Sequence, residues 1–116
     1  MFIKLNHKSL QIYEAIRELP RGVYAVSMKL PPKEKFNMVQ QIRRAALSVK
    51  LNLAEGSTRK SPNERRRFYE VARGSVVEID AVLETSVDLN YCEGNQWNSI
   101  AELLNKRFAR LSNIID

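Results

Sequence analysis

The sequence predicts an all-α fold, an antiparallel up-down-up-down four-helix bundle that forms one domain over residues 1–116. Apolar residues recur at steps of three and four in four successive segments, and none shows the alternation of a half-buried strand. The chain has only four Gly and four Pro, which suits long helices. A hydrophobic fraction of 44% beside 28% charged residues is typical of one folded core.

The first helix is expected from about Ser9 to Met28, where the apolar residues keep heptad spacing. Pro20 interrupts it, since proline removes one backbone hydrogen bond and clashes with the preceding turn. Because the repeat stays in phase on both sides of Pro20, we expect one kinked helix rather than two. The dipeptide Pro31-Pro32 should end it.

The second helix is expected to start near Lys33 or Glu34 and to end around Glu55-Gly56, where glycine can adopt the left-handed closing conformation. Besides its main apolar stripe, this helix carries a second one, formed by Leu47, Leu51 and Ala54.

The third helix has the clearest start. Ser61 is a good N-cap, Pro62 suits the first helical position, and Glu64 completes a capping box. Its apolar repeat continues to Leu89. A second stripe widens the apolar face and consists of Val76, Leu83 and Val87.

The fourth helix is expected from about Trp97 to Ile115, after a turn over residues 91–95. Four helices joined by short links pack as antiparallel neighbours. The second stripes on the two central helices exceed what one bundle core needs, and surplus apolar surface on a small domain indicates a subunit interface. We therefore expect a homo-oligomer.

Charge is divided along the chain. Residues 43–73 hold nine Lys and Arg against three Glu, whereas residues 74–102 hold six acidic residues and no Lys or Arg. The formal net charge is +6. Segregation of this kind indicates a polar partner, either nucleic acid or another copy of the chain.

No pattern predicts catalysis, a cofactor, a metal site or a small-molecule substrate. His7 is the lone histidine, Cys92 is the lone cysteine, and the four glycines are isolated, so we expect no metal centre, nucleophile–base pair or phosphate loop. We expect no membrane-spanning helix, because no long apolar run occurs, and no signal peptide. These features favour a non-enzymatic protein of the cytoplasm.

Polar residues interrupt the apolar faces of the second and third helices. They are predicted to form a structural network of paired charges and satisfied amides, because the Glu-x-x-His pattern of di-metal bundles does not occur. The residues are Ser48, Asn52, Glu55, Arg73, Ser75 and Glu78. Small residues nearby, among them Ala45, Ala46 and Gly74, should let these helices approach closely.

The basic residues give the strongest functional hypothesis. Three arginines in the first turns of the third helix oppose the helix dipole, which suggests a compensating anion. The alternative is a solvated charge run or salt bridges to Glu64, Glu70 and the acidic stretch of another subunit. The candidate nucleic-acid-binding residues are Arg43, Arg44, Lys50, Arg59, Lys60, Arg65, Arg66, Arg67 and Arg73.

A combined motif runs through residues 41–78. Its matched positions are Arg43-Arg44-Ala45, Ser48, Asn52, Leu53-Ala54-Glu55-Gly56, Arg59, Ser61, Ala72, Gly74-Ser75 and Glu78. In these positions the chain resembles a family of four-helix bundles named for proteins encoded in intervening sequences of bacterial 23S ribosomal RNA genes. The resemblance extends from about Leu10 to Leu111, and Pro20 departs from the commoner pattern.

The resemblance implies an up-down-up-down bundle that assembles as a ring, typically a homopentamer. A related group consists of accessory proteins to the reverse transcriptases of diversity-generating retroelements, in which a basic pentamer surface binds nucleic acid and the enzyme. Residues and resemblance together predict a homo-oligomeric bundle whose basic surface binds structured RNA. The alternative is a structural or protein-interaction scaffold in which basic and acidic faces pair between subunits.

Overall fold

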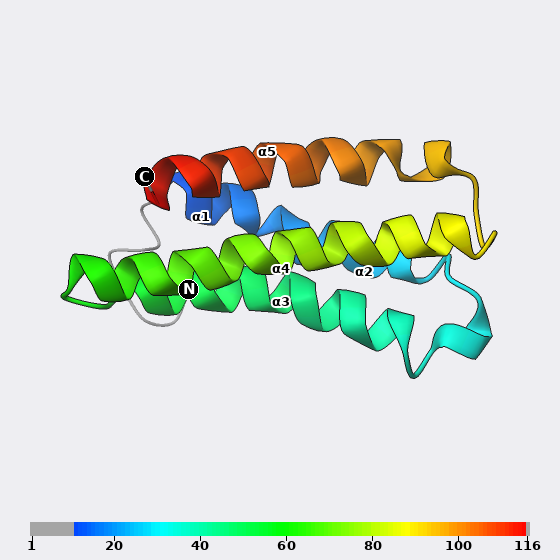
Figure 1. Cartoon of the computed structure of the whole chain (residues 1–116), viewed down its shortest axis with the longest axis horizontal. Coiled ribbons are helices and arrows are strands. Elements are labelled where there is room, and N and C mark those ends of the chain that lie inside the picture. The colour runs from blue at the N-terminus through cyan, green and yellow to red at the C-terminus, as the bar shows by residue number, and fades with distance from the viewer. Residues whose placement is uncertain (1–10, 116) are drawn as a thin grey trace.

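The computed structural model describes residues 11–115, in which four helical rods pack side by side (Figure 1). The rods are α1 (Gln11–Ile16) with α2 (Glu18–Ser27), α3 (Met38–Ser57), α4 (Pro62–Asp88) and α5 (Asn98–Ile115). Short 3-10 helices, η2 (Pro32–Glu34) and η3 (Gly94–Trp97), lie in two links. Successive rods run in opposite directions. The predicted all-α bundle is confirmed for this part of the chain, whereas His7 and Ser9 lie outside it.

The rods pack in cyclic order. α2 lies against α3, α3 packs most extensively on α4, α4 contacts α5, and α5 returns to α1 and α2. Buried residues from all of them form one core. Fully buried members include Ile16, Leu19, Ile42, Leu53, Ile79 and Leu111.

The first rod is interrupted at a single residue, Arg17, whose backbone torsions stay helical (φ −58°, ψ −26°). Its N–H still bonds the carbonyls of Tyr13 and Glu14, at 3.1 and 3.2 Å. Pro20 has no N–H to donate to the carbonyl of Ile16, and its ring crowds that carbonyl. The interruption therefore falls one turn before the proline. It divides the rod into α1 and α2, where one kinked helix was expected.

The predicted start of the second helix at residue 33 or 34 is wrong, because α3 begins at Met38. Residues 32–34 form η2, and Asn37 has non-helical torsions (φ −129°, ψ −90°). The Glu34 carboxylate accepts hydrogen bonds from Asn37 Nδ2 at 3.1 Å and from the Tyr91 hydroxyl at 2.5 Å. The segment thus ties two links together instead of extending α3.

The predicted role of Gly56 is also wrong. No described glycine has a positive φ, and α3 continues to Ser57. A β-carbon at Gly56 would lie 2.7 Å from that of Phe68, so glycine is needed here for the close packing of α4 on α3. Gly74 was expected to allow such an approach, but a β-carbon there would meet no atom within 4 Å.

Both ends of α4 follow from local sequence. Ser61 Oγ accepts the backbone N–H of Glu64 at 3.4 Å, and Pro62 occupies the first helical position, as predicted. The predicted capping box is incomplete, because the Glu64 side chain makes no hydrogen bond to the Ser61 N–H. After α4, Asn90 adopts the left-handed conformation (φ 61°), and the Tyr91 N–H bonds the carbonyl of Ser86 at 2.9 Å. This hydrogen bond satisfies one carbonyl at the helix end and turns the chain toward α5.

The two extra apolar stripes have different environments. On α4, Val76 and Leu83 are buried and Val87 packs against the core, so this stripe is core rather than surplus. On α3, Leu47 and Leu51 are 43% and 55% exposed. They lie on the side of α3 opposite its buried residues, because positions four apart share one helical face.

Candidate nucleic-acid interface

The candidate basic residues do not form one cluster. Five of them gather at the turn between α3 and α4, at one end of the bundle (Figure 1). These are Arg59, Lys60, Arg65, Arg66 and Arg67. The other four lie along the helices, with Arg43, Arg44 and Lys50 on α3 and Arg73 on α4.

Two arginines at the turn support its own structure. Arg65 Nη1 donates to the backbone carbonyls of Arg59 and Lys60, each at 2.9 Å. Arg59 Nη2 lies 2.7 Å from Glu55 Oε1, and its guanidinium is 4.9 Å from the ring centre of Phe68. Both side chains therefore make contacts within the turn itself.

The remaining three residues of the turn are unpaired. Lys60, Arg66 and Arg67 are exposed and make no ion pair or side-chain hydrogen bond with any described residue. Arg66 and Arg67 lie within the first turns of α4, where the helix dipole disfavours positive charge. We call these three residues the turn cations. An anionic partner would relieve both their mutual repulsion and their repulsion by the helix end.

Arg43 and Arg73 are bound within the fold on opposite sides of the α3–α4 pair. Arg43 Nε donates to Ser27 Oγ of α2 at 2.8 Å and lies 4.8 Å from the ring centre of Tyr24. Arg73 Nη1 donates to Ser112 Oγ of α5 at 3.1 Å. Both arginines join neighbouring rods. Arg44 and Lys50 have no such partner among the described side chains.

Three of the predicted network residues come together at the α3–α4 interface. Ser75 Oγ donates to Ser48 Oγ at 2.8 Å, and Asn52 Nδ2 donates to the same hydroxyl at 3.0 Å and to the Ser48 carbonyl at 2.9 Å. The other three lie elsewhere: Glu55 pairs with Arg59, Arg73 with Ser112, and Glu78 is exposed.

The C-terminal half of α4 is acidic and unpaired. Every ion pair among the described residues is local, between Arg17 and Glu14, Arg59 and Glu55, and Lys106 and Glu102. The exposed carboxylates in this half of α4 therefore have no basic partner within the described chain; they are Glu78, Asp80, Glu84 and Asp88. The bundle is basic at the α3–α4 turn and acidic toward the other end of α4.

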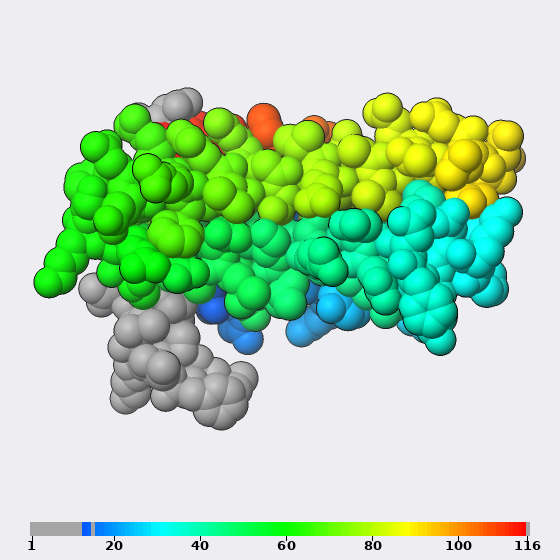
Figure 2. Space-filling model, turned by 60° about the horizontal axis from the view of Figure 1, so that its bottom comes forward, coloured from blue at the N-terminus to red at the C-terminus, as the bar shows by residue number. Residues whose placement is uncertain are grey.

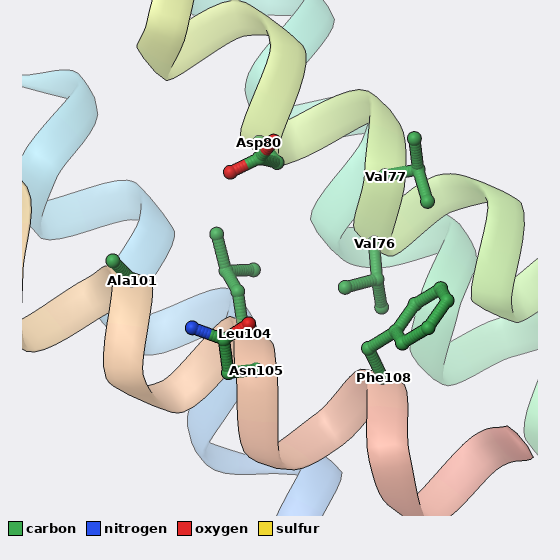
Figure 3. A pocket seen from close by; sticks show the side chains of 7 residues that line it. All are labelled: Val76, Val77, Asp80, Ala101, Leu104, Asn105 and Phe108. Carbon is green, nitrogen blue, oxygen red and sulfur yellow. The ribbon is translucent and has the colours of Figure 1, made fainter.

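The surface of the bundle carries grooves between its helices. One of about 170 Å³ lies between α4 and α5, where Val76, Leu104 and Phe108 provide apolar walls and Asp80 and Asn105 provide the polar groups (Figure 3). Within the described part of the chain, no three His, Cys, Asp or Glu side chains are placed to hold a metal ion. No helix of that part is long and apolar enough to cross a membrane.

One basic segment lies outside the predicted site. Lys29, Lys33 and Lys35 precede Phe36 in the link between α2 and α3, and Phe36 is 77% exposed. These lysines lie outside the basic stretch of residues 43–73. Phe36 lies within the second helix as it was expected from the sequence. The signal that could have found them is an aromatic residue preceded by two lysines directly after Pro31-Pro32.

Comparison with known proteins places this geometry in a family. The model of the 23S rRNA-intervening sequence protein family matches residues 8–113. A solved structure from Bacteroides thetaiotaomicron, a protein of unknown function from the S23 ribosomal protein family, superimposes with a TM-score of 0.81. The two chains are 22% identical, and the match covers 90% of this chain and 98% of that one, so it shows a shared fold. The comparison with curated proteins gave no match.

Proposed function

Because the chain belongs to the 23S rRNA-intervening sequence protein family, we propose that it is a non-enzymatic, homo-oligomeric bundle that binds structured RNA through the α3–α4 turn. One observation carries this proposal. Lys60, Arg66 and Arg67 are exposed, unpaired and lie around the N-terminus of α4. Cations that the fold itself does not use are available to phosphate groups.

The turn is suited to phosphate for two physical reasons. Backbone N–H groups at a helix N-terminus and the helix dipole both favour an anion. Arginine presents a planar fork of donors that matches phosphate oxygens. Since Arg65 and Arg59 brace the turn from within, the turn cations are held near one another before any ligand arrives.

The proposed oligomer is a ring, a homopentamer by the family resemblance. Its support in this chain is the apolar pair on α3, Leu47 and Leu51, which are 43% and 55% exposed. Apolar surface on a small basic protein is costly in water, and a second copy could bury it. A ring would also repeat the turn cations around its axis and so multiply the RNA contacts.

The test is a titration of a fluorescently labelled RNA hairpin with the whole chain, followed by anisotropy at several salt concentrations. The double variant Arg66→Ala/Arg67→Ala should weaken binding and reduce the steepness of the log–log salt dependence by about one to two units, since each phosphate contact contributes roughly 0.7–0.9. Arg65 is left intact, because its loss would loosen the turn.

The matched control is Arg21→Ala/Lys106→Ala, which lowers the net charge equally at exposed positions of α2 and α5. This control should bind the hairpin with nearly the wild-type salt dependence. Equal losses of hairpin affinity in the two double variants would mean that net charge, and not the turn, drives binding. The assigned surface would then be wrong.

The second candidate is a scaffold in which subunits pair through charge. The unpaired carboxylates Glu78, Asp80, Glu84 and Asp88 favour it, because they could meet the turn cations of another copy. Such an oligomer would dissociate in high salt, since exposed charge pairs are screened, and would show no affinity for RNA. Light scattering coupled to size exclusion, with and without RNA, distinguishes the two candidates.

A further inference from the structure

The link between α2 and α3 presents an aromatic ring among lysines. Phe36 is 77% exposed, and Lys35 Nζ lies 5.4 Å from its ring centre. Lys29 and Lys33 are exposed in the same link. We call Lys29, Lys33, Lys35 and Phe36 the lysine tip. It lies at the end of the bundle opposite the α3–α4 turn, at the lower right of Figure 2.

The lysine tip is braced. Pro31 and Pro32 restrict the backbone, and the N–H groups of Glu34, Lys35 and Asn37 each close a turn onto the carbonyl three residues earlier, at 2.9 to 3.1 Å. The Tyr91 hydroxyl anchors Glu34 from the α4–α5 link at 2.5 Å. A braced segment loses little conformational entropy when it binds, so an exposed ring is held ready for a partner.

The charge around Phe36 is positive. None of the three lysines makes an ion pair with a described residue, and the carboxylate within the tip, Glu34, is engaged by Tyr91 and Asn37. Lys33 Nζ lies 5.2 Å from the ring centre of Tyr91, which keeps it beside the anchor. One ammonium group, that of Lys35, therefore lies over the exposed ring of Phe36, and two further unpaired lysines lie in the same link.

We propose that the lysine tip binds an unpaired nucleobase of single-stranded nucleic acid, with Phe36 stacking on the base and the lysines contacting the flanking phosphates. Stacking on exposed aromatics within a basic surface is the general mode of single-strand recognition. Lysine is depleted at protein–protein interfaces, which makes a protein partner the weaker fit. The inference rests on the proposed RNA binding. It differs from that proposal in using the lysine tip instead of the turn cations, and in taking single-stranded instead of structured nucleic acid as the ligand.

The experiment compares two labelled RNAs, an oligouridylate of about 12 nucleotides, which suits single-strand site sizes, and a blunt duplex without unpaired bases. Phe36→Leu keeps an apolar side chain but removes the aromatic face. It should weaken oligouridylate binding roughly 5- to 100-fold, the loss expected for one stacked base, and leave duplex binding unchanged. Phe36→Trp should restore the affinity, and oligouridylate should quench the introduced indole.

The outcomes separate this inference from the proposed function. If the wild type binds the duplex but not oligouridylate, or if Phe36→Leu leaves oligouridylate binding intact, the lysine tip is not a base-binding site while RNA binding at the turn stands. If oligouridylate binds and the duplex and hairpin do not, the lysine tip is supported, and the proposed binding of structured RNA at the turn is wrong. If Phe36→Leu changes only the oligomeric state, the tip contacts protein and the inference fails.

Discussion

A β-carbon added to Gly56 would lie 2.7 Å from the β-carbon of Phe68, closer than two such carbons approach in real structures. Gly56 is buried near the end of α3, and Phe68 lies in the second turn of α4, directly after the turn that carries the candidate RNA contacts. The contact therefore sets how closely the two helices approach where the turn cations are presented.

Gly56→Ala should destabilise the protein. The added methyl group collides with a β-carbon that is attached directly to the backbone of α4. Overpacking of this kind costs about 1–3 kcal/mol. The better helix propensity of alanine offsets up to about 1 kcal/mol of that cost. Gly74→Ala is the matched control, because its β-carbon would meet nothing within 4 Å, and it should stabilise by about 0.5–1 kcal/mol. Urea unfolding followed by circular dichroism measures both. Similar changes in the two variants would contradict the packing role of Gly56.

The sequence predicted the helices better than their ends. Heptad spacing and the Ser61 cap are local signals, and both appear in the structure. The start of α3 was missed because Glu34 is held by Tyr91, which is far away in the sequence. The role of Gly56 was missed for a similar reason. A glycine at a helix end looks the same in sequence whether it turns the chain or admits a neighbouring helix.

Ser86→Ala should lower stability by about 1–3 kcal/mol. The Ser86 hydroxyl is fully buried, accepts the indole N–H of Trp97 at 2.9 Å and donates to the Leu83 carbonyl at 2.6 Å. Its removal leaves the buried indole N–H without a partner, which costs the desolvation of that group. Thr85→Ala removes an equivalent bond to a backbone carbonyl, but at an exposed position.

The Thr85→Ala control should stay within about 0.5 kcal/mol of the wild type. Thermal unfolding and the emission of Trp97 together report the effect. The Ser86→Ala prediction is wrong if both variants unfold at the wild-type temperature.

The Tyr91–Glu34 hydrogen bond should make stability depend on pH at both extremes. The bond lowers the pKa of Glu34 below its ordinary value of 4.5 and raises that of Tyr91 above 10.0. A lowered carboxyl pKa adds stability at pH values above 4.5, and this stability is lost as the pH falls through the folded-state pKa. A raised tyrosine pKa adds stability at pH values below 10.0, and this stability is lost as the pH rises through the folded-state pKa.

Tyr91→Phe removes both contributions. Its deficit in unfolding free energy should therefore be largest between about pH 5 and 9 and should shrink in acid and in base. Denaturant unfolding from about pH 3 to about pH 11 measures the deficit. Glu34→Gln in the Tyr91→Phe background should add little. A deficit that is the same at pH 3 as at pH 7 would show that the hydroxyl acts without the carboxylate.

The candidate site was less predictable than the fold. Counting charges over residues 43–73 found the basic residues but could not separate those used by the fold from those left free. Arg43 and Arg73 each bond a serine on a neighbouring rod, and the position of that serine depends on tertiary packing. Phe36 was missed because the periodic pattern assigned it to a helix that does not extend so far.

Arg43→Ala and Arg73→Ala should separate stability from RNA binding. Each arginine lies over an aromatic ring and bonds a serine across a helix interface, so its loss should cost about 1 kcal/mol of unfolding free energy. Because neither guanidinium is free for phosphate, hairpin affinity should fall less than about threefold, the effect of one distant screened charge. Arg66→Ala/Arg67→Ala should show the opposite pattern, with weaker binding and unchanged stability. If Arg73→Ala weakened the hairpin complex as strongly as that double variant, the RNA surface would have to include the α4–α5 side of the bundle.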